Sequence, residues 1–313
     1  MKRINFRTYL RIMRPDHWIK QLFILPGVGF ALYSVPTVEE SGLILRLVLG
    51  FMATCLIASA NYVINEWLDR DFDRYHPVKK HRSIVENGAD ARIVYLLYAV
   101  LTAAGLLLAF SIRFLFGMTA LLLWIMGIVY NVKPLRTKDI PFVDVLSESV
   151  NNAIRLLLGW FLVTDSFLPP SSLILGYWMA GAFLMATKRF SEYRMIDNPE
   201  TAGLYRKSFQ HYTERSLLLS SFFYAMCSTM FLGIFLIKYD VNMVLLMPLV
   251  IGLFCYYFSI SYKKDSAAQK PEKLYREKGL MFYVLLVILL FFLLLSVDIP
   301  LLESLYSTDL VPV

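Results

Sequence analysis

Residues 61–82 read NYVINEWLDRDFDRYHPVKKHR, and they follow an apolar run at residues 43–60 that is long enough to form a membrane helix. Where this helix should meet water, the sequence places Asn65, Glu66, Asp69 and Asp73. At about 100° per helical residue these four side chains share one face, whereas Asp71 points to the opposite side. The stretch therefore predicts a membrane helix whose end carries a polar, mostly acidic stripe.

The chemistry of this stripe favours a metal site. Carboxylates that converge at a membrane edge repel one another and are costly to desolvate. A divalent cation offsets both effects, and Mg²⁺ prefers one or two carboxylates together with substrate phosphates. Lys79, Lys80 and Arg82 follow closely and suit the remaining phosphate oxygens. We therefore expect a Mg²⁺–diphosphate site facing the cytosol, with Asn65, Glu66, Asp69 and Asp73 as candidate metal ligands.

The composition indicates an all-α integral membrane protein. The chain has 313 residues, 58% of them hydrophobic, and its mean hydropathy is +0.56. No linker rich in Pro, Gly or Ser and no low-complexity tract interrupts it, so we expect a single domain over residues 1–313. Apolar runs of roughly twenty residues predict nine transmembrane helices. These runs lie at 19–35, 43–66, 93–111, 114–131, 143–164, 171–190, 216–237, 242–261 and 279–297.

The placement of basic residues predicts the topology. Of the 31 Lys and Arg residues, 27 lie in five segments, at 1–20, 67–92, 131–142, 188–215 and 262–278. The positive-inside rule places these segments in the cytoplasm. Arg155 lies inside an apolar run, which leaves only Arg46, Arg113 and Lys238 for the opposite side. The C-terminal tail has acids and no base, and nine spans deliver it outside. The N-terminal residues resemble no cleaved signal. The net charge of +7 is thus explained by membrane topology and anionic substrates, not by nucleic acid.

Polar residues inside the fifth predicted span form a second constellation. Asp144, Glu148, Asn151 and Arg155 are spaced by four, three and four residues, which aligns them on one helical face. Arg155 lies about 16 Å beyond Asp144, at a depth where a lipid-facing charge is expensive. It should face a cavity or a carboxylate, and the structural alternative is an ion pair, either between Glu148 and Arg155 or across helices.

Two loops and a third cluster add to the predicted site. The loop at 130–144, YNVKPLRTKDIPFVD, is either a topology signal or a set of phosphate contacts. The loop at 188–215 is rich in basic, hydroxyl and aromatic residues and is a candidate lid. Lys188, Arg189 and Glu192 share one helical arc at the end of the sixth span, which echoes the polar end of the second span. Two related halves would then face a central cavity.

These residues resemble the UbiA superfamily of intramembrane prenyltransferases, whose members have about nine helices around a central cavity. The first motif of the superfamily is Asn-Asp-x-x-Asp-x-x-x-Asp. The sequence Asn65-Glu66-x-x-Asp69-x-x-x-Asp73 matches it, with Glu in the second place. Glu is one methylene longer than Asp, and it can still ligate or position Mg²⁺.

A closer resemblance, across most of the chain, is to the decaprenyl-phosphate phosphoribosyltransferase branch of this superfamily. The opening motif of that branch matches Arg14, Pro15, Trp18 and Lys20, with Gln21 in place of Asn. Its first motif continues through Asp73, His76, Pro77, Lys79 and Arg82. Further matches are Tyr130, Lys138, Asp144 and Arg155, with a Tyr–Lys stretch about three residues longer here, and the cluster Lys188-Arg189-x-x-Glu192. That cluster stands where aromatic prenyltransferases of the superfamily carry a second Asp-rich motif.

The resemblance implies Mg²⁺-dependent transfer of 5-phosphoribose from phosphoribosyl diphosphate to a polyprenyl phosphate, whose tail lies in an apolar groove open to membrane lipids. Implied catalytic residues are Asp69, Asp73, Lys20 and Arg155. Implied substrate-binding residues are Lys20, Tyr130, Lys79, Arg82, Lys138, Asp144, Arg155, Lys188, Arg189 and Glu192. One alternative is a prenyltransferase that joins a prenyl diphosphate to an aromatic or other acceptor. Another is a non-catalytic transporter or binding protein for phosphorylated lipids.

Overall fold

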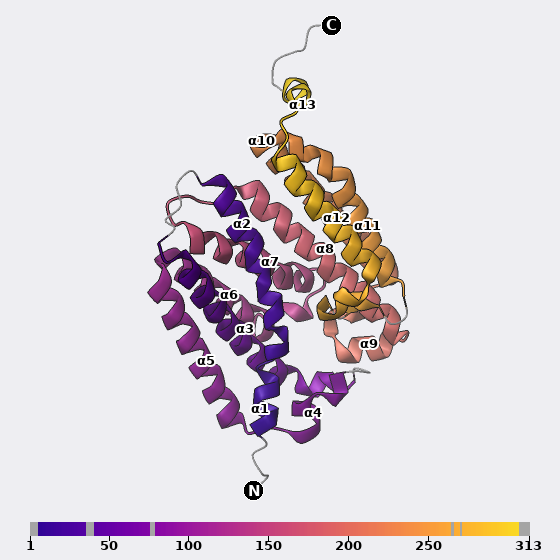
Figure 1. The fold of residues 1–313 in the computed structure, drawn as a ribbon. Helices are drawn as coiled ribbons and strands as arrows, with labels where there is room; N and C mark the ends of the chain where they lie inside the picture. The colour runs from indigo at the N-terminus through magenta and orange to yellow at the C-terminus, as the bar shows by residue number, and fades with distance from the viewer. Residues whose placement is uncertain (1–5, 36–40, 76–78, 264–265, 270, 307–313) are drawn as a thin grey trace. The chain divides into compact units, whose positions relative to one another are not determined.

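The computed structural model describes residues 6–35, 41–75, 79–263, 266–269 and 271–306. His76 and Pro77, which contribute to the phosphoribosyltransferase-like motif, lie outside these ranges. The described residues form helices and connecting segments and contain no β-strand (Figure 1). The predicted all-α class is therefore confirmed for this part of the chain.

The chain divides into two compact units, which we describe separately. The first unit comprises Met1–Pro169 and Ile196–Thr213, and the second comprises Pro170–Met195 and Glu214–Val313. The segment Ile196–Thr213 thus belongs to the first unit, although in the sequence it lies between the helices of the second. A single domain over the whole chain remains a prediction.

The first unit is built around long helices that pack lengthwise. In chain order its elements are α1 (Phe6–Ile12), η1 (Pro15–Ile24), α2 (Leu25–Ser34), α3 (Leu43–Asp73), η2 (Lys79–His81), α4 (Ser83–Asn87), α5 (Ala91–Ile112), α6 (Phe114–Asn131), η3 (Thr137–Asp139), α7 (Val143–Val163), α9 (Pro199–Tyr205) and η4 (Lys207–Gln210). Helix α3 packs against α5 and α6, while α7 packs against α2 and α6 (Figure 1). Large buried side chains, including Phe116 and Trp160, fill the core between them.

Two glycines allow α2 and α7 to approach at backbone distance. A Cβ added to Gly27 would lie 1.9 Å from the carbonyl oxygen of Leu156. A Cβ added to Gly159 would lie 1.9 Å from the carbonyl oxygen of Ile24. Small residues permit such approaches between membrane helices, where dispersion replaces the hydrophobic effect as the source of attraction. The contact holds α7, which carries the predicted Asp144–Arg155 stripe, against the N-terminal helices.

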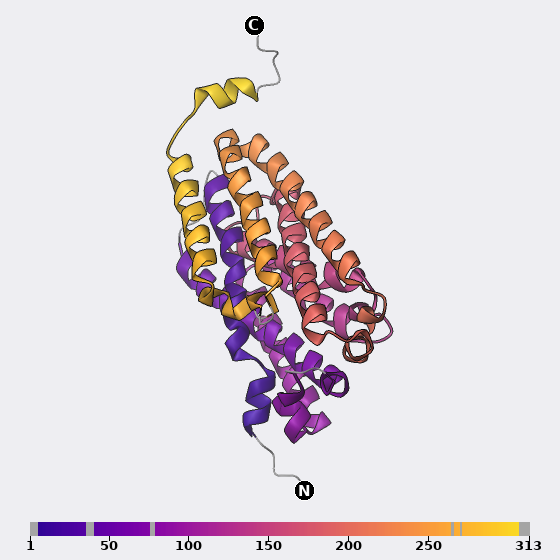
Figure 2. The same cartoon turned by 90° about the vertical axis from the view of Figure 1, so that its right-hand side faces the viewer.

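The second unit is a group of long apolar helices. Its elements are α8 (Ser171–Ile196), α10 (Glu214–Tyr239), η5 (Val241–Leu246), α11 (Met247–Ser261), η6 (Ala267–Gln269), η7 (Pro271–Arg276), α12 (Lys278–Leu295) and α13 (Pro300–Leu305). Helix α11 packs against both α10 and α12 (Figure 2). The Phe183 ring on α8 meets the ring of Phe254 edge-on, with 4.8 Å between their centroids. Aromatic contacts of this kind help to join the helices of the unit.

Six of the described helices are long and apolar enough to cross a membrane: α3, α5, α6, α10, the combined stretch Val241–Ser261, and α12. The predicted runs at 143–164 and 171–190 are helical too, but α7 and α8 carry several charged side chains. In the run at 19–35, η1 precedes the ten-residue helix α2. The protein is therefore a multi-pass membrane protein, although its predicted count of nine spans is not confirmed.

Candidate active site

The polar stripe predicted from residues 65–73 lies on the last turns of α3, because this helix continues unbroken from Leu43 to Asp73. Asp71 is mostly exposed and lies 3.5 Å from Arg74, as expected for a residue on the outer face. Asp73 is almost fully buried. The helical register predicted from the sequence is thus observed, and the acidic side chains of the stripe face other parts of the first unit.

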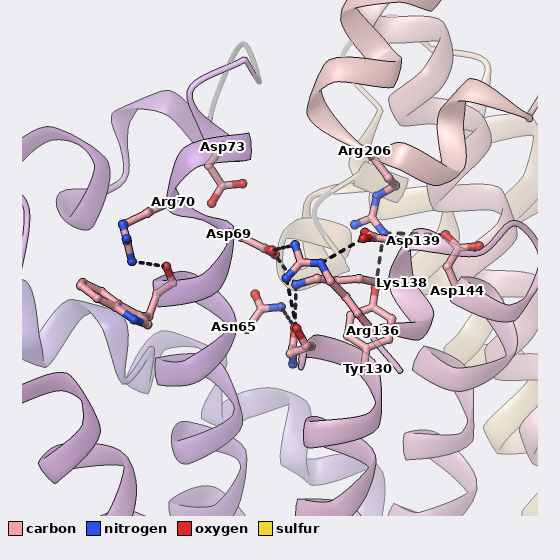
Figure 3. A network of polar contacts seen from close by, with 12 residues as sticks. Asn65, Asp69, Arg70, Asp73, Tyr130, Arg136, Lys138, Asp139, Asp144 and Arg206 are labelled. Carbon is pink, nitrogen blue, oxygen red and sulfur yellow. Dashed lines mark hydrogen bonds and ion pairs between the residues drawn. The ribbon is translucent and has the colours of Figure 1, made fainter. Parts of the chain in front are cut away.

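Asp69 is the centre of a network formed with the loop between α6 and α7. Its Oδ1 lies 2.5 Å from the Lys138 ammonium and 2.9 Å from the Arg136 guanidinium (Figure 3). Arg136 also lies 3.1 Å from Asp139. The Lys138 side chain is only 4% exposed, so its interaction with Asp69 is weakly screened by solvent. The loop at 130–144, which the sequence predicted to be either a topology signal or a set of phosphate contacts, therefore contacts the acidic end of α3 directly.

Asn131, at the end of α6, sets the orientation of its neighbours. Its Nδ2 donates to the carbonyl oxygen of Gly127 at 2.8 Å, so its Oδ1 is the accepting atom. That oxygen accepts from Asn65 Nδ2 at 2.5 Å and from Lys138 Nζ at 2.8 Å. Because Asn65 directs its nitrogen toward Asn131, its amide oxygen is turned away from Asn131 (Figure 3). An amide oxygen presented in this way is a suitable ligand for Mg²⁺.

Other cationic side chains lie close to Lys138. Its pKa is lowered to about 8, because burial and the nearby Arg136 and Arg206 disfavour the charged ammonium more than Asp69 favours it. Arg136, Lys138 and Arg206 thus gather near the Asp69 carboxylate, although Asp139 also pairs with Arg136 and Asp144 with Arg206. A bound phosphate would relieve their mutual repulsion, and it would accept hydrogen bonds from donors that are already positioned.

Glu66 and Asp73 face a second group of cations. Arg14 Nε lies 2.8 Å from Glu66 Oε1, and Arg82 Nη1 lies 2.6 Å from Asp73 Oδ2. Arg82 also reaches Glu66, with 3.8 Å between Nε and Oε1. Burial would lower the pKa of Arg82, but the carboxylates of Asp73 and Glu66 outweigh it and the pKa is raised. The four predicted metal ligands therefore divide into an Asn65–Asp69 pair and a Glu66–Asp73 pair, each facing its own basic residues.

Within the described residues, no three His, Cys, Asp or Glu side chains gather as a ready-made metal cluster. Mg²⁺ does not need one, because it keeps several water or phosphate ligands and takes few from the protein. The candidate donors are the hard oxygens of Asn65, Glu66, Asp69 and Asp73, which is the ligand type that this ion prefers. The donor set fits a Mg²⁺ ion that is held partly by its substrate.

Asp144, at the start of α7, is fully buried and has several partners. It accepts from Tyr212 at 2.6 Å and from Ser208 at 3.2 Å, and Arg206 lies 3.7 Å away. Arg206 Nη1 also lies 3.4 Å from the hydroxyl of Tyr130 (Figure 3). Two predicted site residues, Tyr130 and Asp144, are thus connected through Arg206. The predicted loop at 188–215 begins within α8 and includes α9 and η4.

Other predicted residues lie elsewhere in the two units. Arg155 Nε donates to Gln21 at 2.9 Å, and its Nη1 donates to Asn152 at 3.1 Å, so its partners are amides and not Glu148. Lys20 lies 3.3 Å from His17. Lys79 is hydrogen-bonded to Tyr205. In the second unit, Arg189 and Glu192 form a buried ion pair at 3.1 Å, next to a half-buried Lys188.

The candidate site residues that sequence analysis did not select include Arg136 of the 130–144 loop, together with Asn131, Arg206, Ser208 and Tyr212. Asn131 directly follows Tyr130, and its position at the end of an apolar run was the available signal. The other three lie in the segment that was considered as a lid. No spacing rule connects that segment to Asp144, because the contact joins residues more than sixty positions apart.

The fold and the site together define a multi-pass helical membrane protein with an acidic helix end set against basic loops. Residues 22–286 match the model of the UbiA prenyltransferase family, and the chain belongs to this family. This membership confirms the resemblance found in the sequence motifs.

Relatives within the family differ in what they are named for. The chain is 26% identical to a decaprenyl-phosphate phosphoribosyltransferase of Mycolicibacterium smegmatis, over 66% of this chain and 63% of that protein. It is 29% identical to the nodulation protein NoeC of Azorhizobium caulinodans, over 66% and 64%. It is 28% identical to a lycopene elongase/hydratase of Haloarcula japonica, over 62% and 64%. The matches thus span less than two thirds of these relatives.

The fold is similar to that of a UbiA homolog from Archaeoglobus fulgidus solved with GPP and Mg²⁺ bound. The TM-score is 0.67 at 23% identity, covering 93% of this chain and 100% of the other. The same homolog solved with DMAPP and Mg²⁺ also gives a TM-score of 0.67.

Proposed function

We propose that this protein is a Mg²⁺-dependent transferase that moves 5-phosphoribose from phosphoribosyl diphosphate to a polyprenyl phosphate. The network around Asp69 is the observation that carries this proposal. It joins the Asp69 carboxylate on α3 to the buried cations Arg136 and Lys138. The Asn65 amide nitrogen donates to the Asn131 oxygen that also accepts from Lys138, which leaves the Asn65 oxygen for a ligand. Oxygen ligands beside fixed cations are complementary to a diphosphate that carries a metal ion.

The candidate metal ligands are Asn65, Glu66, Asp69 and Asp73, as the sequence motif predicts. When bound, Mg²⁺ would neutralise charge on the departing diphosphate. The neighbouring cations suit the same task because they are already held in place. Arg136 and Lys138 are fixed by Asp69, and Arg82 is fixed by Asp73. Preorganised donors of this kind stabilise developing charge without reorganising during the reaction.

The proposed reaction breaks the anomeric carbon–oxygen bond to diphosphate and forms a bond from that carbon to an oxygen of the lipid phosphate. Displacement at an anomeric carbon passes through an oxocarbenium-like transition state, so most catalysis would come from stabilising the leaving group. The lipid phosphate is already a competent nucleophile and needs no strong general base. Lys20, Lys79 and Arg82 are proposed phosphate contacts. The other proposed substrate-binding residues are Tyr130, Lys138, Asp144, Arg155, Lys188, Arg189 and Glu192. The proposed catalytic residues are Asp69, Asp73, Lys20 and Arg155.

Two observations support a phosphoribosyl donor. Relatives from Mycolicibacterium smegmatis and Corynebacterium glutamicum are named decaprenyl-phosphate phosphoribosyltransferases. In addition, the polar end of α8 offers Lys188 and Arg189 with the single acid Glu192, which is already ion-paired. A cluster of this composition suits a phosphate better than a second metal ion.

The main alternative is transfer of a prenyl group from a prenyl diphosphate to an aromatic or other acceptor. The UbiA homolog from Archaeoglobus fulgidus was solved with GPP and Mg²⁺, and other relatives are named a lycopene elongase/hydratase and a protoheme IX farnesyltransferase. A non-catalytic lipid-phosphate transporter is a further alternative. Its signature would be ligand flux without a covalent product, whereas a site reached from one side of the membrane favours an enzyme.

The architecture that accompanies this proposal has about nine helices around a central cavity in one domain. We place the N-terminus and the active site at the cytosolic face and the C-terminus outside, from the distribution of Lys and Arg. A membrane-impermeant reagent added to intact cells that carry tagged versions of the protein would test this orientation. Labelling of the C-terminal tag alone is expected, and labelling of an N-terminal tag from the outside would contradict it.

Ligand protection distinguishes the two donors. Purified protein in detergent with Mg²⁺ would be heated with phosphoribosyl diphosphate or with geranyl diphosphate at equal concentration. A ligand that binds the folded state stabilises it by RT ln(1 + [L]/Kd), so at equal concentration the ligand with the lower Kd gives the larger rise in the unfolding midpoint. The proposal expects the larger shift from phosphoribosyl diphosphate. A larger shift from the prenyl diphosphate would favour the alternative.

A further inference from the structure

The segment Ile196–Thr213 is fastened to the first unit at both of its edges. At one edge, the side chain of Tyr205 at the end of α9 is hydrogen-bonded to Lys79 of η2, and the Lys79 ammonium lies 4.6 Å from the centre of the Tyr205 ring. Helix α9 also contacts α3. This edge is therefore attached close to the acidic end of α3.

At the other edge, Tyr212 holds the segment to the start of α7. Its hydroxyl donates to Asp144 at 2.6 Å and accepts from the backbone N–H of Phe142 at 2.5 Å. The rings of Tyr212 and Phe142 meet edge-on, with 5.2 Å between centroids. Ser208 adds a second hydrogen bond to Asp144, at 3.2 Å. Asp144 is fully buried, so these bonds replace water that the carboxylate has lost.

The backbone at this attachment is held in an uncommon conformation. Phe142 has a backbone φ angle of +63°, a value that residues other than glycine rarely adopt. The hydroxyl of Tyr212 binds the N–H of this same residue. Since such conformations persist where their surroundings hold them, the Tyr212 contact belongs to a defined local structure rather than to a loose surface loop.

Between the two attachments, the segment carries Arg206. Its guanidinium lies 3.7 Å from Asp144 and 3.4 Å from the hydroxyl of Tyr130, and Tyr130 is in turn near the Lys138 ammonium, 5.8 Å from its ring centre. Figure 3 shows Arg206 and Lys138 on the same side of Tyr130 as the Asp69 network. Arg206 thus joins Arg136 and Lys138 as a cation of this site.

We propose that Arg206 is an anion-binding residue for the diphosphate ligand of this site, and that Asp144 and Tyr212 are positioning residues that hold it there. The inference rests on the proposed function in one respect, that the ligand carries a diphosphate. Tyr130 and Asp144 orient the guanidinium, as substrate-positioning residues do when they fix a donor before the ligand arrives. The segment then serves as a strap across the end of α3, with a cation between its two attachments.

Binding of inorganic pyrophosphate with Mg²⁺, measured by calorimetry on the full chain in detergent, tests the role of Arg206. Arg206→Gln should weaken binding by roughly tenfold to a hundredfold, the range for a lost hydrogen bond to a charged group. Arg206→Lys should recover part of the loss because it keeps the charge without the planar fork. Equal affinities for the wild type and Arg206→Gln would overturn the assignment.

The positioning role is tested by Tyr212→Phe, which keeps the ring and removes only the hydroxyl. Trypsin cleavage after Arg206 or Lys207 should become faster in this variant. Pyrophosphate binding should weaken at least threefold, which corresponds to about half of the binding free energy lost in a tenfold effect. Tyr9→Phe is the matched control, since it removes a hydroxyl that is bonded to the backbone N–H of Asp90 in the same unit. Its binding and cleavage should stay at wild-type values.

If Tyr212→Phe behaves like Tyr9→Phe in both measurements, the positioning role is wrong. Ser208→Ala gives a second route should Tyr212→Phe fail to fold, and it should shift both measurements in the same direction. Pyrophosphate is common to phosphoribosyl and prenyl donors. Failure to form a phosphoribosyl product would therefore defeat the proposed function while leaving the effect of Arg206→Gln intact.

Discussion

Asp69 and Lys138 are 69 positions apart in the sequence, and in the structure their Oδ1 and Nζ atoms lie 2.5 Å apart. This contact brings the acidic end of α3 to the loop between α6 and α7. Replacing only one member of a mostly buried ion pair strongly lowers the free energy of unfolding, because the remaining buried charge loses its partner. The pair is therefore both a structural connection and the centre of the proposed diphosphate site.

A double-mutant cycle separates these two roles. Lys138→Met alone and Asp69→Asn alone should each lower the free energy of unfolding, by on the order of 3 kcal/mol for the loss of one buried partner. The double variant should be destabilised by less than the sum, with a coupling of about 1–3 kcal/mol. Thermal unfolding in detergent measures stability, and product formation measures activity. Activity should remain absent in the double variant, and simple additivity of the two destabilisations would contradict the pairing.

Asn131 should act on the metal through Asn65. Asn131→Ala removes the acceptor that holds the Asn65 amide and the Lys138 ammonium. The Mg²⁺ concentration for half-maximal activity should rise roughly tenfold or more, as for other residues that orient metal ligands. Asn61→Ala is the matched control, because Asn61 makes a comparable bond from α3 to the carbonyl oxygen of Leu123 on α6. Equal Mg²⁺ dependence in the two variants would argue against this role.

The close approach of α2 and α7 predicts a contrast between two glycines. Gly159→Ala places a methyl group against the backbone of Ile24 and should destabilise the protein by roughly 1–3 kcal/mol, as overpacking does. Gly29→Ala meets nothing within 4 Å and should be neutral or stabilising by about 0.5–1 kcal/mol. Unfolding midpoints of both variants in detergent provide the comparison. A Gly159→Ala protein as stable as Gly29→Ala would contradict the packing.

Arg155 should not be replaceable by lysine. Its Nε and Nη1 atoms donate to Gln21 and Asn152 at the same time, a geometry that only the planar guanidinium provides. We expect Arg155→Lys to lower the rate of product formation roughly tenfold or more, since each of these bonds contributes to its placement. Arg113→Lys, at a pair with the exposed Asp165, should cost about 0–1 kcal/mol and leave activity unchanged. Similar activity in the two variants would remove Arg155 from the site.

Much of the helical framework was predictable from the sequence, because it depends on local periodicity. The run predicted at 114–131 coincides with α6, and that at 93–111 falls within α5. The shared face of Asn65, Asp69 and Asp73 also follows from the pitch of one helix. Charges placed inside an apolar run were harder to interpret, since the same residues lower hydropathy and build the polar site. Among the described residues, six helices are long and apolar enough to cross a membrane, against nine predicted spans. Helices α7 and α8 carry such charges, and the run at 19–35 is divided between η1 and the short helix α2.

The pairing of charges could not be predicted, because it depends on which loops meet in three dimensions. The ion pair considered between Arg155 and Glu148 is not what the structure shows, because Arg155 binds Gln21 from η1, 134 positions away. The stripe on α3 was interpreted as one set of metal ligands. That metal-ligand set stays a prediction, but the sequence did not indicate that Glu66 reaches Arg14 while Asp69 reaches Lys138, so that neighbouring acids face different basic partners. Helical periodicity gives the face of a residue and does not give its partner.

Product analysis tests the central claim most directly. Purified protein in detergent would receive Mg²⁺, phosphoribosyl diphosphate labelled in the ribose, and a polyprenyl phosphate, with Asp69→Asn and a chelator as controls. The account predicts a lipid-extractable phosphoribosyl product that requires the acceptor and disappears in both controls. If no labelled lipid forms over several acceptor chain lengths, while a prenyl diphosphate and an aromatic acid do react, the proposed donor is wrong and the prenyltransferase alternative holds.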